Sequence, residues 1–385
     1  MQPAARIAAA IELLDEILDG APAERSLTAW ARRSRFAGSK DRNAIRDYVY
    51  DALRCRRSFA ALGGAETGRG LMIGALKSLG APLDDLFTGT GHAPSPLTET
   101  ERATPLLDTL PAAVRLDCPD WLLPTFETDL GAQTEPALMA LRERAPIFLR
   151  VNTLKATVEL ALKSLADDDI EAQRVDGVET ALVVTANERR IRTSSAFESG
   201  LVELQDASSQ AAVLRLSGQG AALDYCAGGG GKSLALAAMG YSVTAHDIDP
   251  ARTGDLPARS QRAGARVDLR SPDELGDREY GLVLADAPCS GSGTWRRTPD
   301  AKWRLTPERL EDLTRIQAEV IRSAAAYVAP SGRLAYATCS VFSCENDAIV
   351  DAFCSGSRWQ VIDKMKLVPS DRGDGFYLAI LGRKT

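Results

Sequence analysis

The stretch DYCAGGGGKS at residues 224–233 follows a short apolar run, AALDY, and precedes a helical pattern, SLALAAM. Two kinds of nucleotide site place glycines at such a strand–turn–helix junction. The phosphate loop of nucleotide hydrolases follows the pattern G-x-x-x-x-G-K-S/T, but its first glycine would fall at Cys226. A cofactor-binding turn of the Rossmann type is followed, about 20 residues later, by an acid that ends the second strand, and Asp247 lies there. This spacing favours a nucleoside cofactor over nucleotide hydrolysis.

Strand-like and helix-like patterns alternate after residue 218, which predicts an α/β fold with a doubly wound parallel sheet. Strand-like runs in this region end at Asp247, Asp286 and Cys339, and Cys289 follows shortly after Asp286. Because the carboxyl ends of parallel strands meet at one edge of a sheet, these side chains should converge on the glycine loop. Two thiols beside a nucleoside pocket indicate thiol addition to an electrophilic ring or carbonyl.

The part of the chain before residue 216 shows different sequence patterns. Apolar residues recur on one helical face from Ile7 to Leu18, with Gly20 as a stop, and a second apolar and basic pattern runs through residues 41–59. From about residue 145, short β-type runs such as IFLRVNTL and ALVVTA flank a helical segment. We therefore expect three domains: an all-α domain at 1–135, a small α+β module at 136–215 and a catalytic α/β domain at 216–385.

Composition excludes several other classes. The 385 residues carry a net charge of −6, unlike a nonspecific nucleic-acid binder, and no apolar run is long enough for a membrane span. The seven cysteines form no Cys-x-x-Cys pair, and with only two histidines we expect no metal site. An odd number of scattered thiols is typical of a reducing compartment. We expect a cytoplasmic monomer.

Two blocks, DAPCSGSGTWRRTPDAKW at 286–303 and YATCSVFSCEND at 336–347, make the pattern specific. They resemble the signature blocks of the RNA cytosine-C5 methyltransferases, the family of the bacterial small-subunit ribosomal RNA methyltransferase B and the Nop2/Sun-domain proteins. The first 135 residues are more weakly similar to the NusB-like helical domain of the bacterial enzymes. The resemblance implies a Rossmann-like, S-adenosyl-L-methionine-dependent methyltransferase domain, and a helical domain that binds RNA.

The resemblance also implies which residues hold S-adenosyl-L-methionine. The family loop has alanine and proline where this chain has Gly228 and Gly229, so the loop loses a fixed φ and relies on its backbone donors. Lys232 and Ser233 are expected to serve the turn and the start of the helix. The implied cofactor-binding residues are Cys226, Ala227, Gly228, Gly229, Gly230, Gly231, Lys232, Asp247 and Asp286.

By the same resemblance, Cys339 is the nucleophile that adds to C6 of the cytosine. Asp286 is implied to hydrogen-bond N3 and the exocyclic amine of the base. Cys289 corresponds to the second family cysteine, which assists release of the methylated RNA. From the residues alone, Cys289 and Cys339 cannot be ranked, and either could be a buried structural thiol.

We expect RNA to be held by the basic and aromatic stretch TWRRTPDAKWR, through Arg296, Arg297 and Lys302, and by Arg150 and Asn152 of the α+β module. A solvated basic face is the alternative for that stretch. The target cytosine must be unstacked, as in a single-stranded loop or a flipped base. Small-subunit ribosomal RNA is the expected substrate, with transfer RNA, or a noncatalytic role in ribosome assembly, as alternatives.

Overall fold

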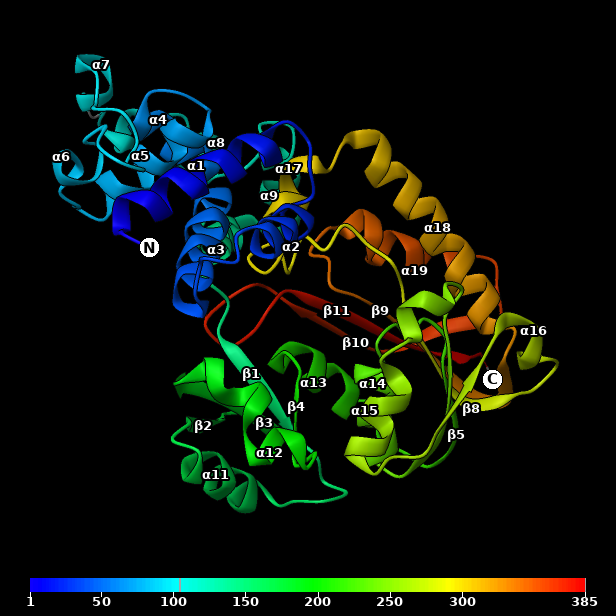
Figure 1. Cartoon of the computed structure of the whole chain (residues 1–385). Coiled ribbons are helices and arrows are strands. Elements are labelled where there is room, and N and C mark those ends of the chain that lie inside the picture. The colour runs from blue at the N-terminus through cyan, green and yellow to red at the C-terminus, as the bar shows by residue number, and fades with distance from the viewer. Residues whose placement is uncertain (104, 385) are drawn as a thin grey trace. The chain divides into compact units, whose positions relative to one another are not determined.

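The computed structural model describes residues 1–103 and 105–384, and it divides into two compact units (Figure 1). Unit 1 consists of Met1–Arg144 together with Trp295–Leu305. Unit 2 consists of Ala145–Thr294 and Thr306–Thr385. The helical unit therefore contains a second, distant piece of the chain that the sequence pattern does not reveal.

Unit 1 is built from helices. The first helix begins with Pro3, whose missing N–H is no loss at this position, and it ends at Leu18, before Gly20 at φ +107°. The predicted apolar face of this helix packs inward, since Ile7 and Leu14 are fully buried. The helices of unit 1 are α1 (Pro3–Leu18), α2 (Ala23–Arg33), α3 (Ser39–Arg54), α4 (Arg56–Gly63), α5 (Gly68–Ser78), α6 (Leu83–Leu86), α7 (Glu99–Arg102), α8 (Ala112–Arg115), α9 (Leu123–Leu130), α10 (Thr134–Arg142) and α17 (Pro299–Arg304).

Glycines let α4 and α5 approach each other closely. A Cβ on Gly63 would lie 1.8 Å from the carbonyl oxygen of Gly70, and one on Gly74 would lie 2.0 Å from that of Phe59. The sequence pattern indicated one helical segment over 41–59. Instead, Cys55 separates α3 from α4, and the glycines serve a helix–helix contact.

The segment Trp295–Leu305 is anchored inside unit 1. The Trp295 ring is buried and meets Phe126 edge-on, with 6.1 Å between the ring centroids. The indole N–H of Trp303 donates to the carbonyl oxygen of Leu53 at 2.6 Å. Trp295, which looked suited to stacking on bases, is thus buried in the helical unit, and the half-buried Trp303 is tied to it by a hydrogen bond.

Two of the basic residues in this segment are also buried, which corrects their predicted role. The Lys302 ammonium donates to the carbonyl oxygens of Asp117, at 2.6 Å, and Arg54, at 3.3 Å, and burial lowers its pKa. Arg296 is 2% exposed, and its carbonyl oxygen accepts a hydrogen bond from Arg54 Nε at 2.7 Å. In this conformation neither side chain can reach RNA, whereas Arg297 is exposed.

Unit 2 contains two sheets. The smaller has four antiparallel strands in the order β2-β3-β1-β4, and the short β-type runs IFLRVNTL and ALVVTA form β1 and most of β3. Its strands are β1 (Ile147–Val151), β2 (Glu171–Val175), β3 (Val178–Ala186) and β4 (Val202–Leu204), with helices α11 (Val158–Asp167) and α12 (Ser195–Glu198).

The larger sheet has seven strands in the order β10-β11-β9-β8-β5-β6-β7. The five strands β5 to β9 are parallel, which confirms the predicted doubly wound α/β fold. The last two strands were not predicted, and β11 pairs antiparallel with both β9 and β10. The strands are β5 (Gly220–Asp224), β6 (Tyr241–His246), β7 (Val267–Arg270), β8 (Tyr280–Asp286), β9 (Val328–Thr338), β10 (Trp359–Leu367) and β11 (Phe376–Arg383).

Helices cover both faces of this sheet. Because side chains alternate along a strand, Leu223 joins the cluster that contains Ile321 of α18, while its neighbour Ala222 joins the cluster that contains Leu236 of α14. The other helices of unit 2 are α13 (Ala207–Leu214), α14 (Gly231–Ala238), α15 (Leu256–Ala263), α16 (Pro272–Leu275), α18 (Pro307–Ala325) and α19 (Asp347–Cys354). Across the described residues, we find no helix with the length and apolarity to cross a membrane.

Candidate active site

The carboxyl ends of the parallel strands bring the sequence-predicted residues of unit 2 together. Strand β5 lies between β6 and β8, so the strand order reverses beside it, and such switch points are where α/β sheets bind ligands. The glycine loop follows β5, Asp247 follows β6, Asp286 ends β8 and Cys339 follows β9. Four separate segments therefore supply one rim.

The glycine loop is held by backbone hydrogen bonds. Ala227 N–H donates to the carbonyl oxygen of His246 at 2.8 Å, which ties the loop to the end of β6. Gly228 and Gly230 have φ of +49° and +79°, a region that disfavours other residues. A Cβ on Gly230 would lie 2.1 Å from Leu256 Cδ1, so a side chain here would also clash with α15.

Asp247 links the end of β6 to this loop. Its carboxylate accepts the N–H of Gly228 at 2.9 Å and that of Asp249 at 3.1 Å, and the Arg252 guanidinium lies 3.3 Å away. A carboxylate has acceptor sites beyond these, which suits the hydroxyls of a ribose. The donor chemistry and the open glycine backbone therefore fit a nucleoside cofactor such as S-adenosyl-L-methionine.

Lys232 has a partner that the sequence did not suggest. Its ammonium lies 2.6 Å from Asp286 Oδ2, across the rim from its own helix. Burial works to lower the pKa of Lys232, but the Asp286 carboxylate outweighs it and raises that pKa. Ser233 behaves differently and donates to Asp224 Oδ2 at 2.6 Å. The side chain of Lys232 therefore lies at the rim formed by the strand ends, whereas that of Ser233 supports the turn.

The two predicted cysteines meet. Cys289 Sγ and Cys339 Sγ are 3.3 Å apart, and both thiols are free. The hydrogen bond from Cys289 lowers the pKa of Cys339, and the same pairing raises the pKa of Cys289 well above its usual range. Thr294 Oγ1 also points to Cys339 Sγ, at 3.9 Å. Of the pair, Cys339 is thus the more readily ionised and the better nucleophile.

Cys226, the thiol of the glycine loop itself, is a poor nucleophile because its pKa is raised. Burial and the surrounding carboxylates of Asp286, Asp224 and Asp247 raise the pKa of Cys226. A thiol that stays protonated is a poor nucleophile. Cys226 thus contributes to the loop through its backbone position.

A buried carboxylate that sequence reasoning missed joins the two cysteine segments. Glu345, fully buried, accepts the N–H of Ser290 at 2.7 Å and Gln317 Nε2 at 2.9 Å. Its other oxygen accepts the hydroxyls of Ser290 and Ser340. Gln317 Nε2 also donates to the carbonyl oxygen of Pro288 at 2.9 Å. Glu345 lies within the second signature block, at 336–347, but no spacing rule marks it as special.

Two predicted RNA contacts in the smaller sheet are instead structural. Asn152 is 1% exposed, and its amide donates to the carbonyl oxygens of Gly200 and Ala263, both at 2.8 Å. Arg150 is 4% exposed, and burial lowers its pKa to about 10. Both side chains lie inside unit 2 and are out of reach of RNA in this conformation, which corrects the prediction.

A second buried acid braces the glycine loop from outside. Glu203 of β4 is 2% exposed and pairs with Arg259, at 3.1 Å, and with Arg262. Arg259 in turn donates to the carbonyl oxygen of Gly229. An ion-pair chain therefore connects the four-stranded sheet to the loop that lacks the rigid proline of the family pattern.

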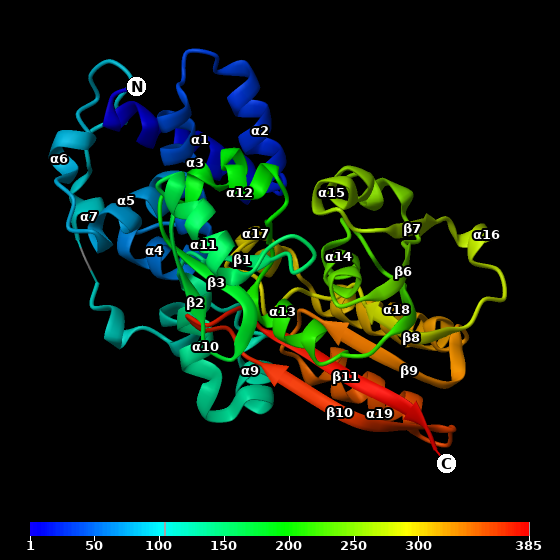
Figure 2. The ribbon, with the colours of Figure 1, turned by 90° about the horizontal axis from the view of Figure 1, so that it is seen from below.

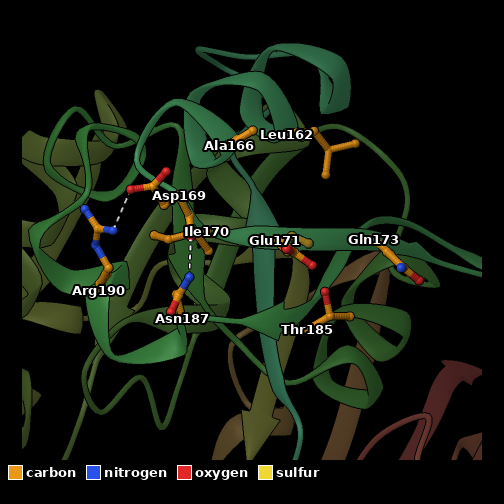
Figure 3. Close-up of a pocket in the computed structure, with 10 residues that line it drawn as sticks. Leu162, Ala166, Asp169, Ile170, Glu171, Gln173, Thr185, Asn187 and Arg190 are labelled. Carbon is orange, nitrogen blue, oxygen red and sulfur yellow. Dashed lines mark hydrogen bonds and ion pairs between the residues drawn. The ribbon is translucent and has the colours of Figure 1, made fainter.

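A hollow of about 820 Å³ in the four-stranded module is a separate feature (Figure 3). Two of its charged groups pair with each other, since Arg190 lies 2.8 Å from Asp169, and Asn187 Nδ2 donates to the carbonyl oxygen of Asp169 at 2.7 Å. None of the predicted site residues lines it. It therefore takes no part in the site at the strand ends.

Two known families match segments of the chain. Residues 211–381 match the family described as 16S rRNA methyltransferase RsmB/F. Residues 118–189 match the ferredoxin-like domain described for RsmF/B-like methyltransferases. These matches confirm the predicted methyltransferase family and, with it, S-adenosyl-L-methionine as the cofactor.

Individual relatives agree with these matches. Ribosomal RNA small subunit methyltransferase B of Yersinia pseudotuberculosis (strain IP 31758) is 34% identical over 285 residues, which cover 69% of this chain and 66% of that protein. The protein of the same name from Enterobacter sp. (strain 638) is 31% identical over 282 residues, covering 68% and 66%. The chain thus spans about two thirds of the length of the curated relatives that it matches.

Solved structures share the fold. The crystal structure of PH0851 covers 100% of this chain and 99% of its own, with a TM-score of 0.78 at 24% identity. A methyltransferase homologue from Pyrococcus horikoshii covers 71% of this chain and 97% of its own, with a TM-score of 0.62 at 23% identity. At these identities, the likeness concerns the fold alone.

Proposed function

Because this chain belongs to the 16S rRNA methyltransferase RsmB/F family, we propose that it methylates carbon 5 of a cytosine in small-subunit ribosomal RNA. The observation that carries this proposal is the thiol pair at the strand ends, with 3.3 Å between Cys289 Sγ and Cys339 Sγ. Methylation of an oxygen or an exocyclic amine would not need a cysteine nucleophile. Carbon 5 of cytosine does, since it becomes nucleophilic only after addition at C6.

Cys339 performs the addition in this proposal. Its thiolate donates an electron pair to C6 and forms an S–C6 bond, while the electrons of the C5–C6 double bond move into the ring and make C5 nucleophilic. The hydrogen bond from Cys289 that lowers the pKa of Cys339 supports this assignment. C5 then forms a bond to the methyl carbon. A base takes the C5 proton, the C5–H electrons restore the C5–C6 double bond, and the S–C6 bond breaks with its electron pair returning to Cys339 as thiolate.

Asp286 and Lys232 stabilise the base as charge develops. Asp286 ends β8 on the rim, where its side chain is 29% exposed and open to a base. In this proposal its carboxylate accepts a hydrogen bond from the exocyclic amine of cytosine, and from N3 once N3 is protonated. The Lys232 ammonium, 2.6 Å from Asp286, offsets negative charge on the carboxylate and the ring. Cys289, the thiol with the raised pKa, stays protonated and assists release of the product.

The glycine loop and two acids would hold the cofactor. Backbone donors of residues 226–232 and the Asp247 carboxylate suit its polar groups, and Asp286 borders the same rim. When bound there, S-adenosyl-L-methionine supplies the electrophilic methyl group. The target cytosine must leave its stack to meet both thiol and cofactor.

Bisulfite sequencing of total RNA tests the activity and finds the substrate together. A strain lacking the gene should lose 5-methylcytosine at a position in small-subunit ribosomal RNA. Loss in transfer RNA alone would correct the substrate, and an unchanged pattern in all RNA would refute the enzymatic function.

Variants of the two cysteines test the mechanism. Cys339→Ala should abolish methyl transfer, whereas Cys289→Ala should accumulate a covalent protein–RNA adduct that survives denaturing electrophoresis. Cys354→Ala, which removes a thiol of α19, is the matched control and should behave like the wild type. An adduct in the Cys339 variant and none in the Cys289 variant would reverse the assignment.

A further inference from the structure

Unit 1 carries a basic surface that the proposed chemistry does not use. Residues 31–46 contain six basic residues and one acid, Asp41, in a chain with a net charge of −6. Asp41 does not neutralise this surface, because it is buried and its carboxylate already accepts hydrogen bonds from the N-terminal amine, at 3.1 Å, and from Arg6 Nε, at 2.8 Å. The basic residues are Arg32, Arg33, Arg35, Lys40, Arg42 and Arg46.

Four of these arginines border one hollow. It measures about 460 Å³ and is lined by Arg32 of α2, Arg35 of the following connection and Arg42 of α3. Figure 2 labels these two helices. Arg46, one turn further along α3, completes it. We name these four residues the arginine cleft. All four are exposed, so their charges face solvent.

Most of this charge is uncompensated. Arg46 pairs with Glu24. Within the part of the chain that the structure describes, the guanidinium groups of Arg32, Arg35 and Arg42 have no ion-pair partner. Like charges gathered on a concave surface repel one another and raise the local concentration of anions. The cleft is therefore built to receive a ligand with several negative charges.

The geometry points to the sugar–phosphate backbone of the RNA substrate as that ligand, and we propose that the arginine cleft binds it. Guanidinium groups match phosphate with paired, parallel hydrogen bonds. Phe36 follows Arg35 in the chain and is 76% exposed, and an exposed aromatic ring close to basic residues is a platform on which an unpaired base can stack. This combination favours single-stranded RNA over an acidic protein.

This inference rests on the proposed function only for the identity of the RNA. It also gives the molecule an RNA-binding surface after Arg150, Asn152, Arg296 and Lys302 proved to be buried. Unlike those four residues, the arginines of the cleft are exposed.

The test is equilibrium binding of the full chain to an unmodified transcript of small-subunit ribosomal RNA over a series of salt concentrations. The variant carries Arg32→Gln, Arg35→Gln and Arg42→Gln together. Each phosphate contact to a single strand contributes about 0.7 to the slope of log K against log salt. The variant should therefore lose about 2 from that slope, and roughly 100-fold in affinity at about 0.1 M salt.

A matched control removes the same charge elsewhere. Arg309, Arg315 and Arg322 are exposed on α18, and their joint replacement by Gln should leave the slope within about 0.5 of the wild type. Replacing the three cleft residues by Lys should restore most of the slope. An unchanged slope in the Gln variant of the cleft, or an equal loss in the control, would overturn the proposal.

The same samples separate this proposal from the proposed reaction. Salt-dependent binding through the cleft without transfer of labelled methyl groups by the wild type would refute the reaction and leave the cleft intact. Methyl transfer with a KM unaffected by the cleft variant would refute the cleft and leave the reaction intact. Thermal unfolding of each variant, expected to match the wild type, checks that the exposed substitutions leave the fold unchanged.

Discussion

Replacing Glu345 by Gln should weaken the structure around the thiol pair without changing its shape. The carboxylate oxygens accept four hydrogen bonds, two from Ser290 and one each from Gln317 and Ser340. An amide of the same size keeps one acceptor oxygen and turns the other position into a donor. The serine hydroxyls can rotate to accept from that donor, so the network can persist in neutral form.

The size of the effect follows from the charge. Hydrogen bonds to a charged group contribute about 1.5–3 kcal/mol and neutral ones about 0.5–1.5 kcal/mol, so neutralisation removes about 1 kcal/mol per bond. Four bonds set an upper bound of about 4 kcal/mol, and relief from burying a charge returns part of it. We expect Glu345→Gln to lower the free energy of unfolding by about 2 kcal/mol. Glu345→Ala should lower it further, because it leaves buried donors without acceptors.

Two measurements test this expectation. Urea unfolding gives the free energy, and alkylation of Cys339 by iodoacetamide over a pH series gives its thiol pKa. The Gln variant keeps the segments that carry both cysteines in place, so only Glu345→Ala should raise the pKa of Cys339 towards its ordinary value, by loosening its pairing with Cys289. Glu319→Gln, an exposed substitution on α18, is the control. Unfolding and alkylation profiles that match the wild type in the Gln and Ala variants would refute this account of Glu345.

Three further predictions concern the same rim. Cys289→Ala removes the donor that lowers the pKa of Cys339, so alkylation of Cys339 below pH 8 should slow by up to about tenfold per pK unit, and an unchanged rate would contradict the pairing. Burial raises the pKa of Asp224 from 3.8 to about 6, so the folded state binds a proton that the unfolded state releases between these values. Stability should therefore fall as pH rises from about 4 to 6, by up to about 3 kcal/mol relative to Asp224→Asn, measured by urea unfolding. Gly230→Ala should lower the free energy of unfolding by about 2 kcal/mol or more, because of its φ of +79° and the clash with Leu256, whereas the same change at exposed Gly80 tests positive φ alone.

The sequence was informative where local pattern and topology act together. Alternating strands and helices predicted the parallel sheet, and the rule for strand ends then brought Asp247, Asp286 and Cys339 to one rim. That rule depends only on chain direction, so it needs no knowledge of side-chain packing. The resemblance to known methyltransferases added the roles of the individual residues.

Other features depend on contacts between distant segments and leave no local signal. Arg296 and Lys302 looked like a solvated basic stretch, but their surroundings come from residues some 180 to 250 positions earlier. Asn152 is buried by carbonyl groups of other segments. The role of Glu345 becomes evident only from the four hydrogen bonds that its carboxylate accepts in the folded structure. Charge and spacing in the sequence cannot distinguish such residues from exposed ones.

The two-piece make-up of unit 1 has a consequence for synthesis of the chain. The ribosome completes Met1–Arg144 and then adds roughly 150 residues before Trp295 emerges. At about 5–20 residues per second, that interval lasts roughly 10–30 s. During it, Phe126 and the carbonyl groups of Leu53 and Asp117 lack the partners that they have in the finished protein. The packing of the helical unit is therefore completed only after most of unit 2 has been synthesised. A nascent chain stalled before residue 305 would present an unfinished core to chaperones and proteases.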